Sequence, residues 1–98
     1  MSAYLVIDVN IKDLTGFMRY VEQVQALIKK HGGRYLVEGE KPVVVEDWRK
    51  TPERMVVLEF PSRAAAQTFL ADRNESGLGE LWARTTKSRI LLLDGPQE

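Results

Sequence analysis

The sequence predicts an α+β fold whose elements follow the order β-α-β-β-α-β, the ferredoxin-like arrangement. Two observations lead to this prediction. Four short runs are rich in β-branched and other aliphatic residues, which is typical of strands. Two longer stretches between them repeat apolar residues every three or four positions, which is typical of amphipathic helices. In this arrangement the strands form one antiparallel sheet, and both helices cover the same face of it.

The first half of the chain is expected to hold a strand, a long helix and a second strand. Residues 4–9 form the first apolar run, and the polar residues after it end the strand. One face of the helix that follows carries Leu14, Phe17, Tyr20, Val21, Val24, Leu27, Ile28 and His31. Asp13 is expected to cap the start of this helix. The glycines of His31-Gly32-Gly33-Arg34 are expected to end it, just before a strand at 34–38.

The second half is expected to hold a loop, a strand, an interrupted helix and a last strand. The expected bounds are, in order, a turn at 39–42, an extended edge piece at 43–46, a polar loop at 48–53, a strand at 55–60, a helix interrupted at 74–79 and a strand at 89–93. Ser62 is expected to cap the second helix. One side of the short helical piece before the last strand carries Leu78, Leu81, Trp82 and Thr85.

Two strands are apolar on both of their faces. The runs at 4–7 and 55–58 are apolar at odd and at even positions, whereas a strand with one wet face alternates apolar and polar residues. Because the helices cover only one face of the sheet, the other face needs a second cover. We therefore expect a homodimer in which the free sheet faces of two subunits pack together.

The composition limits the classes of protein to which the chain can belong. The 98 residues are 44% hydrophobic, and we expect a single domain over residues 1–98. The charges of the fourteen basic and fourteen acidic residues cancel, and a net charge of zero argues against a nucleic-acid partner bound through its phosphates. The start of the chain has no basic leader, and its apolar run is too short to span a membrane. These features predict a cytoplasmic protein with neither a nucleic-acid nor a membrane partner.

Several chemistries find no support in the sequence. The chain has no cysteine, which excludes disulfides, thiol nucleophiles and thiolate-bound metal clusters. It has one histidine, which argues against a transition-metal site built from one chain. No phosphate-binding glycine-rich loop and no Gly-x-Ser-x-Gly motif is present. We therefore expect neither a metal nor a cofactor.

Two residues are candidates for proton transfer. His31 is the only histidine and titrates most readily near neutral pH, although a histidine in the last turn of a helix also interacts favourably with the helix end. Glu59 lies on a central strand, and a carboxylate that points into an apolar interior has a raised pKa and can act as an acid or a base. An ion pair of Glu59 with Arg34 or Arg54 is the competing interpretation.

Aromatic and charged residues suggest a ligand site. Tyr4, Tyr20, Tyr35, Trp48 and Trp82 are candidates to line a cavity for a flat apolar ligand, although aromatic residues at such spacing more often belong to the core. Tyr20 lies on the apolar stripe of the first helix and is expected to pack there. The candidate ligand-binding residues are Arg34, Trp48, Tyr4 and Asp8.

The chain resembles a known family. The residues that carry the resemblance are His31-Gly32-Gly33-Arg34, Trp48, the run from Arg54 to Ser62 and the closing Leu93-Asp94-Gly95. Together they are similar to the domain-of-unknown-function 1330 family, over nearly the whole chain. The resemblance implies a dimeric α+β barrel fold, and it carries no established activity, substrate or cofactor.

Three functions remain open from the sequence. The first is a small-ligand binding protein with a pocket beside the sheet. The second is a cofactor-independent enzyme, similar to a monooxygenase or an isomerase, acting on a small aromatic or carbonyl compound with Glu59 or His31 as the proton-transfer group. The third is a structural or regulatory dimer that binds another protein.

Overall fold

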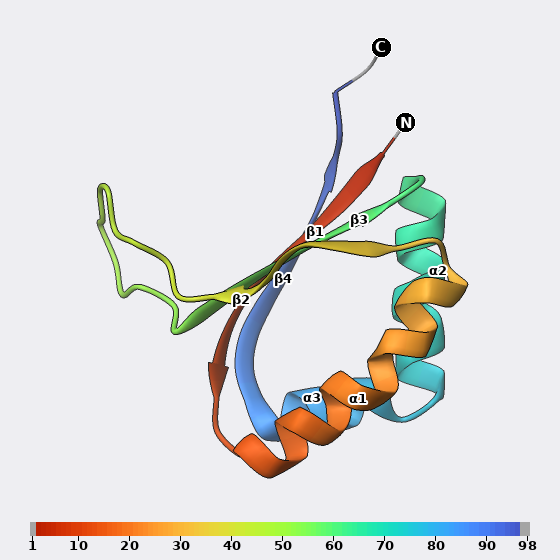
Figure 1. Ribbon diagram of the computed structural model, residues 1–98, viewed down its shortest axis with the longest axis horizontal. Helices are drawn as coiled ribbons and strands as arrows, with labels where there is room; N and C mark the ends of the chain where they lie inside the picture. Colours follow the sequence, from red (N-terminus) through yellow and green to blue (C-terminus); the bar gives the residue numbers. More distant parts are fainter. Residues whose placement is uncertain (1, 97–98) are drawn as a thin grey trace.

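The computed structural model describes residues 2–96 and contains one four-stranded sheet with three helices on one of its faces (Figure 1). The elements are β1 (Ala3–Ile11), α1 (Leu14–Lys30), β2 (Arg34–Glu40), β3 (Arg54–Phe60), α2 (Arg63–Glu75), α3 (Leu78–Thr85) and β4 (Thr86–Asp94). The predicted domain also includes residues 1, 97 and 98, which lie outside the described residues.

The sheet has the strand order β2-β3-β1-β4, so the first strand of the chain lies in its interior. β1 pairs antiparallel with both β3 and β4, and β2 pairs antiparallel with β3. This order and these directions confirm the predicted β-α-β-β-α-β arrangement with helices on one face of an antiparallel sheet (Figure 1).

The predicted helix signals are present where the sequence places them. The side chain of Asp13 accepts a hydrogen bond from the backbone N–H of Gly16, and that of Ser62 accepts one from Ala65, so each caps its helix. Gly32 has a φ of 75°, a left-handed conformation that lets the chain leave α1 and enter β2.

The sheet differs from the prediction at four places. β2 runs to Glu40, two residues beyond its expected end and into the predicted turn. β1 and β4 are longer than expected because the chain passes directly from α3 into β4, where Thr86 and Lys87 pair with Ile11 and Asn10. The edge piece expected at 43–46 is not a strand but part of the loop over residues 41–53. β3 pairs with β1 on one edge and with β2 on the other, so it has no edge left for this segment.

The core lies between the sheet and the helices. Leu5, Val9 and Phe60 are almost completely buried, and Phe69 of α2 packs its ring 5.1 Å from that of Phe60. α1 packs against α3 and α2, and a space remains between it and the sheet. No helix in residues 2–96 combines the length and the apolar character that a bilayer crossing requires.

Candidate functional site

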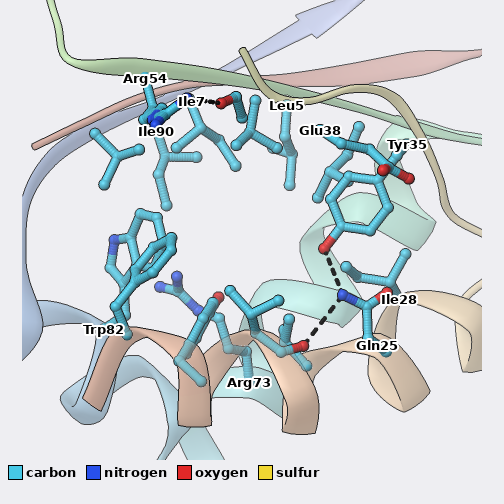
Figure 2. A pocket seen from close by; sticks show the side chains of 18 of the residues that line it. Leu5, Ile7, Gln25, Ile28, Tyr35, Glu38, Arg54, Arg73, Trp82 and Ile90 are labelled. Carbon is cyan, nitrogen blue, oxygen red and sulfur yellow. Dashed lines mark hydrogen bonds between the residues drawn. The ribbon is translucent and has the colours of Figure 1, made fainter. Parts of the chain in front are cut away.

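A cavity of about 530 Å³ occupies the space between α1 and the sheet (Figure 2). Its wall is mostly apolar, because alternate residues of β1 and the inner face of α1 point into it. The polar side chains on the wall are Tyr20, Gln25, Tyr35, Glu38, Arg54 and Arg73. Mostly apolar walls with a few polar groups are typical of small-molecule sites.

One end of the cavity is aromatic. The rings of Tyr20 and Trp82 lie 4.9 Å apart, and the ring of Phe17 lies 6.0 Å from that of Trp82. The indole Nε1–H of Trp82 donates to the hydroxyl of Ser88 at 2.7 Å, which holds the ring in one orientation. Burial raises the pKa of Tyr20, so its hydroxyl stays protonated at neutral pH.

At the other end, a hydrogen-bonded pair joins β2 to α1. The Gln25 amide donates to the hydroxyl of Tyr35 at 3.0 Å and to the carbonyl of Val21 at 3.1 Å (Figure 2). Burial raises the pKa of Tyr35, and the nearby Glu38 carboxylate adds to this rise. The phenol therefore stays protonated at neutral pH and keeps its own O–H available as a donor.

Three charged side chains lie on the cavity wall. Arg54 and Glu38 come from the two strands at the β2 edge, and Arg73 comes from α2. An Arg54 N–H donates to the carbonyl of Gly39 at 3.3 Å (Figure 2). Among residues 2–96, neither Arg54 nor Arg73 forms an ion pair. No three acidic or histidine side chains of the described residues cluster in a way that would hold a metal ion.

Glu59 lies on the face of the sheet that the helices leave free. Its neighbours Leu58 and Phe60 point toward the helices, so Glu59 points away from them. Its carboxylate accepts a hydrogen bond from Nε of Arg34 at 2.7 Å, and this bond lowers the pKa of Glu59. The expectation of a raised pKa in an apolar interior is therefore wrong, and the ion pair with Arg34 is confirmed.

The other predicted ligand residues also lie away from the cavity. Tyr4 pairs with Glu59 across β1 and β3 on the free face, and Asp8 forms an ion pair with Arg89 at 3.0 Å on that face. Trp48 is 87% exposed in the 41–53 loop, with the guanidinium of Arg49 5.3 Å from its ring. Asp8 and Trp48 both line a second, open hollow of about 780 Å³ between this loop and the free face.

His31 ends α1 and is held by α2. Its Nε2 lies 2.9 Å from a carboxylate oxygen of Asp72, and Lys30 contacts the same oxygen at 3.0 Å. The hydrogen bond from His31 is the main reason that the pKa of Asp72 is lowered, and Lys30 adds to it. His31 thus ties the two helices together and does not line the cavity. Catalytic roles for His31 and Glu59 stay predictions.

The Asp72 contacts predict an acid-sensitive link between α1 and α2. Because the pKa of Asp72 is lowered in the folded chain, its stabilising effect is complete above about pH 4 and is lost as the pH falls through the lowered value. Asp72→Asn should therefore have a lower melting temperature than the natural protein at pH 6, and the difference should shrink toward pH 2. For Glu22→Gln, an exposed change on α1, the difference in melting temperature from the natural protein should not depend on pH in this way. If the difference for Asp72→Asn were the same at pH 6 and pH 2, the stabilising role of the Asp72 carboxylate would be contradicted.

Sequence reasoning missed the charged residues of the cavity. Arg73 follows Phe69 by four positions, so both lie on the inner face of α2, and this spacing was a usable signal. Arg54 precedes Val56 by two positions on the same strand face. Of the five aromatic candidates, the structure brings Tyr20, Tyr35 and Trp82 to the cavity; Tyr4 and Trp48 lie elsewhere.

The sheet, its helices and the cavity between them define a ferredoxin-like α+β protein with a partly open cavity under its first helix. The chain belongs to the family described as "Domain of unknown function (DUF1330)", whose model matches residues 2–96. No curated protein sequence matches the chain significantly.

Solved structures share the fold at low sequence identity. A protein of unknown function from Rhodopseudomonas palustris has a TM-score of 0.75 and 13% identity, over 99% of this chain and 84% of that one. A variant of SnoaB, a cofactor-independent oxygenase from Streptomyces nogalater, has a TM-score of 0.68 and 12% identity, over 99% and 95%. A dimeric ferredoxin-like protein from an uncultured marine organism has a TM-score of 0.59 and 10% identity, over 100% and 97%.

Proposed function

We propose that the protein is a cytoplasmic homodimer that binds a small, largely apolar ligand in the cavity between α1 and the sheet. The observation that carries this proposal is the cavity itself, about 530 Å³ with an apolar wall and a few polar groups. Small-molecule sites usually measure about 300–1,000 Å³. Protein interiors are otherwise close-packed, with few voids larger than a water molecule.

The polar groups of the wall support a binding role over a packing defect. The hydroxyl of Tyr35 is positioned by Gln25, and the indole of Trp82 is positioned by Ser88, so both rings keep defined orientations without a ligand. A rigid wall lowers the entropy cost of binding because few side chains must be ordered when the ligand enters. The flat rings at the aromatic end favour a ligand with a flat apolar body.

A cavity-filling variant tests this function. Val21→Trp places a large ring on the cavity wall, and we expect it to abolish ligand binding. The measurement is native mass spectrometry of protein purified from its source organism, which should show an added small-molecule mass on the natural protein and none on the variant. Val45→Trp makes the same change at a position that is 93% exposed in the loop and should keep the added mass. The same added mass on Val21→Trp would place the ligand outside the cavity.

The free face of the sheet supports the homodimer. The strand register aligns Val37, Val57, Val6 and Leu91 in one row across all four strands. The ion pair of Arg34 with Glu59 lies on one side of this row, and that of Asp8 with Arg89 lies on the other. We name this surface, the valine–leucine row with its two ion pairs, the free-face row. An apolar centre with paired charges at both margins is self-complementary under a two-fold rotation.

The loop between β2 and β3 adds to the same argument. It projects beyond the sheet, away from the helices (Figure 1). Val43, Val45 and Trp48 are each more than 85% exposed in it. A second subunit on the free face would lie against this loop and cover some of these side chains. The dimeric state of the marine ferredoxin-like protein, which has the same fold, is consistent with such an assembly.

Cofactor-independent catalysis is the second candidate, supported by the shared fold with the oxygenase SnoaB and by the ionisable groups on the cavity wall. Tyr35 and Glu38 together offer a phenol and a carboxylate at the β2 end of the cavity. If the protein is such an enzyme, the natural protein should chemically convert the bound compound during incubation in air. The Glu38→Gln variant should still bind the compound but should no longer convert it. A compound that is recovered unchanged after incubation with the natural protein would favour the binding role.

A further inference from the structure

Arg73 brings a permanent positive charge to the cavity without a carboxylate partner. It lies on the inner face of α2, and its guanidinium points into the cavity (Figure 2). Its Nε is buried and has no hydrogen-bond partner among residues 2–96. Its guanidinium makes a long hydrogen bond, 3.3 Å, to the amide oxygen of Asn74 and lies beside the Tyr20 hydroxyl, and neither of these groups carries a negative charge.

Arg73 differs from the arginines that form ion pairs on the surface. Arg34, Arg63 and Arg89 each contact a carboxylate, at 2.7, 2.8 and 3.0 Å respectively. All three are more exposed than Arg73, yet Arg73 lacks an ion pair among the described residues. Arg54, the other arginine of the cavity wall, also lacks one, but only Arg73 has a buried Nε without a partner in this part of the chain. A buried donor without an acceptor costs folding free energy, and an unpaired buried charge costs more. An anionic ligand would supply the missing acceptor.

The surroundings of Arg73 favour a carboxylate on a flat apolar body. The protonated Tyr20 hydroxyl is close enough to Arg73 for the guanidinium to offset part of the burial-induced rise in the pKa of Tyr20. The ring of Tyr20 also lies 4.9 Å from that of Trp82, so the positive charge of Arg73 lies close to an aromatic part of the cavity wall. A guanidinium is planar and matches the two oxygens of a carboxylate better than it matches any single acceptor.

We propose that the ligand of the cavity is a small aromatic carboxylate whose carboxylate group is bound by Arg73 and whose ring packs toward Tyr20 and Trp82. The inference rests on the proposed binding function and names the chemical class of its ligand. The formal charge of the cavity wall agrees with it, because Arg54 and Arg73 contribute two positive charges and Glu38 one negative charge.

The test compares two probes of the same shape, 2-naphthoate and the neutral 2-naphthamide. The chain has two tryptophans, so Trp48→Phe leaves Trp82 on the cavity wall as the only indole fluorophore. In this background, quenching of Trp82 fluorescence reports binding. We expect naphthoate to bind at least about tenfold more tightly than naphthamide, which corresponds to about 1.4 kcal/mol. Arg73→Gln should remove this preference and leave naphthamide binding unchanged.

Two arginine variants serve as controls. Arg19→Gln removes an exposed arginine from α1 and should keep the tenfold preference. Arg54→Gln removes the other cavity arginine; a loss of preference there, with Arg73→Gln unaffected, would overturn the assignment to Arg73. Equal binding of both probes to the parent protein would overturn the anionic ligand class and keep the cavity function. Binding of neither probe would count against both proposals.

A second variant keeps the test valid if Arg73→Gln does not fold. Arg73→Met retains a long side chain and removes the unpartnered Nε–H. Without any probe, its melting temperature should equal or exceed that of the parent protein, while the preference for naphthoate is lost. A fall of several degrees would show that Arg73 stabilises the fold and would contradict a ligand-binding role.

Discussion

Replacing Val57 by glutamate should leave the protein monomeric at micromolar concentration. Val57 lies inside the free-face row, between Val37 and Val6. If two such faces pack together, each glutamate would be buried in an apolar interface without a partner. The uncompensated burial of a carboxylate costs several kcal/mol, and a two-fold dimer incurs this cost twice. Sedimentation or native mass spectrometry should show the dimer mass for the natural protein and the monomer mass for the variant.

The matched control is Gln23→Glu, which adds the same charge to an exposed position of α1. This variant should stay dimeric. Circular dichroism should show the natural helix and strand content for Val57→Glu, because the free face is outside the core between sheet and helices. A dimeric Val57→Glu would show that the subunits associate through another surface. A monomeric natural protein would contradict the argument from the two apolar strand faces.

The order of the elements was predictable because its signals are local. The three-to-four-residue spacing along α1 reports burial of one helix face, and Asp13 and Ser62 mark the helix starts through bonds to residues three positions away. The assignment of β-α-β-β-α-β follows from such local patterns. Antiparallel pairing then leaves few arrangements in which both helices cover one face.

The direction of Glu59 was not predictable in the same way. Residues 55–58 are apolar at odd and even positions, so the strand itself does not show which face meets the helices. The pairing of Leu58 with Leu5 determines which face of the sheet Glu59 lies on, and these two residues are more than 50 positions apart in the sequence. An assignment of Glu59 to the interior was therefore a choice between two faces, and the structure shows the other one.

The cavity was visible in the sequence only in part. Tyr20, Tyr35 and Trp82 were considered as cavity residues because aromatic side chains suggest ligand contact. Arg73 comes just before the expected helix interruption, where a charged residue is easily interpreted as exposed. Its spacing of four positions from Phe69 indicates the inner face of α2, but the cavity beside it depends on how α2 packs beside α1 and α3. The charged groups that matter most for ligand class thus required the tertiary structure.

Gly33→Ala should lower the free energy of unfolding by about 2 kcal/mol, within the usual range for an overpacked core. A Cβ at position 33 would lie 2.6 Å from Cε1 of Phe60 and 3.0 Å from Cγ2 of Ile28. Phe60 is fully buried and does not line the cavity, so its ring has no free space to move into. Urea denaturation of the two proteins measures the difference, with the slope of the transition expected to stay the same.

Gly77→Ala separates steric overlap from backbone strain. Gly77 has a φ of 86°, and a Cβ there would meet nothing within 4 Å, so its substitution costs only the strain of a left-handed conformation, about 1 kcal/mol. If Gly33→Ala lowers the free energy of unfolding no more than Gly77→Ala does, the Phe60 side chain can shift to make room for the added Cβ. A larger loss would explain why two glycines follow α1: Gly32 is needed for its φ of 75°, whereas Gly33 is needed because Phe60 occupies the space of its side chain.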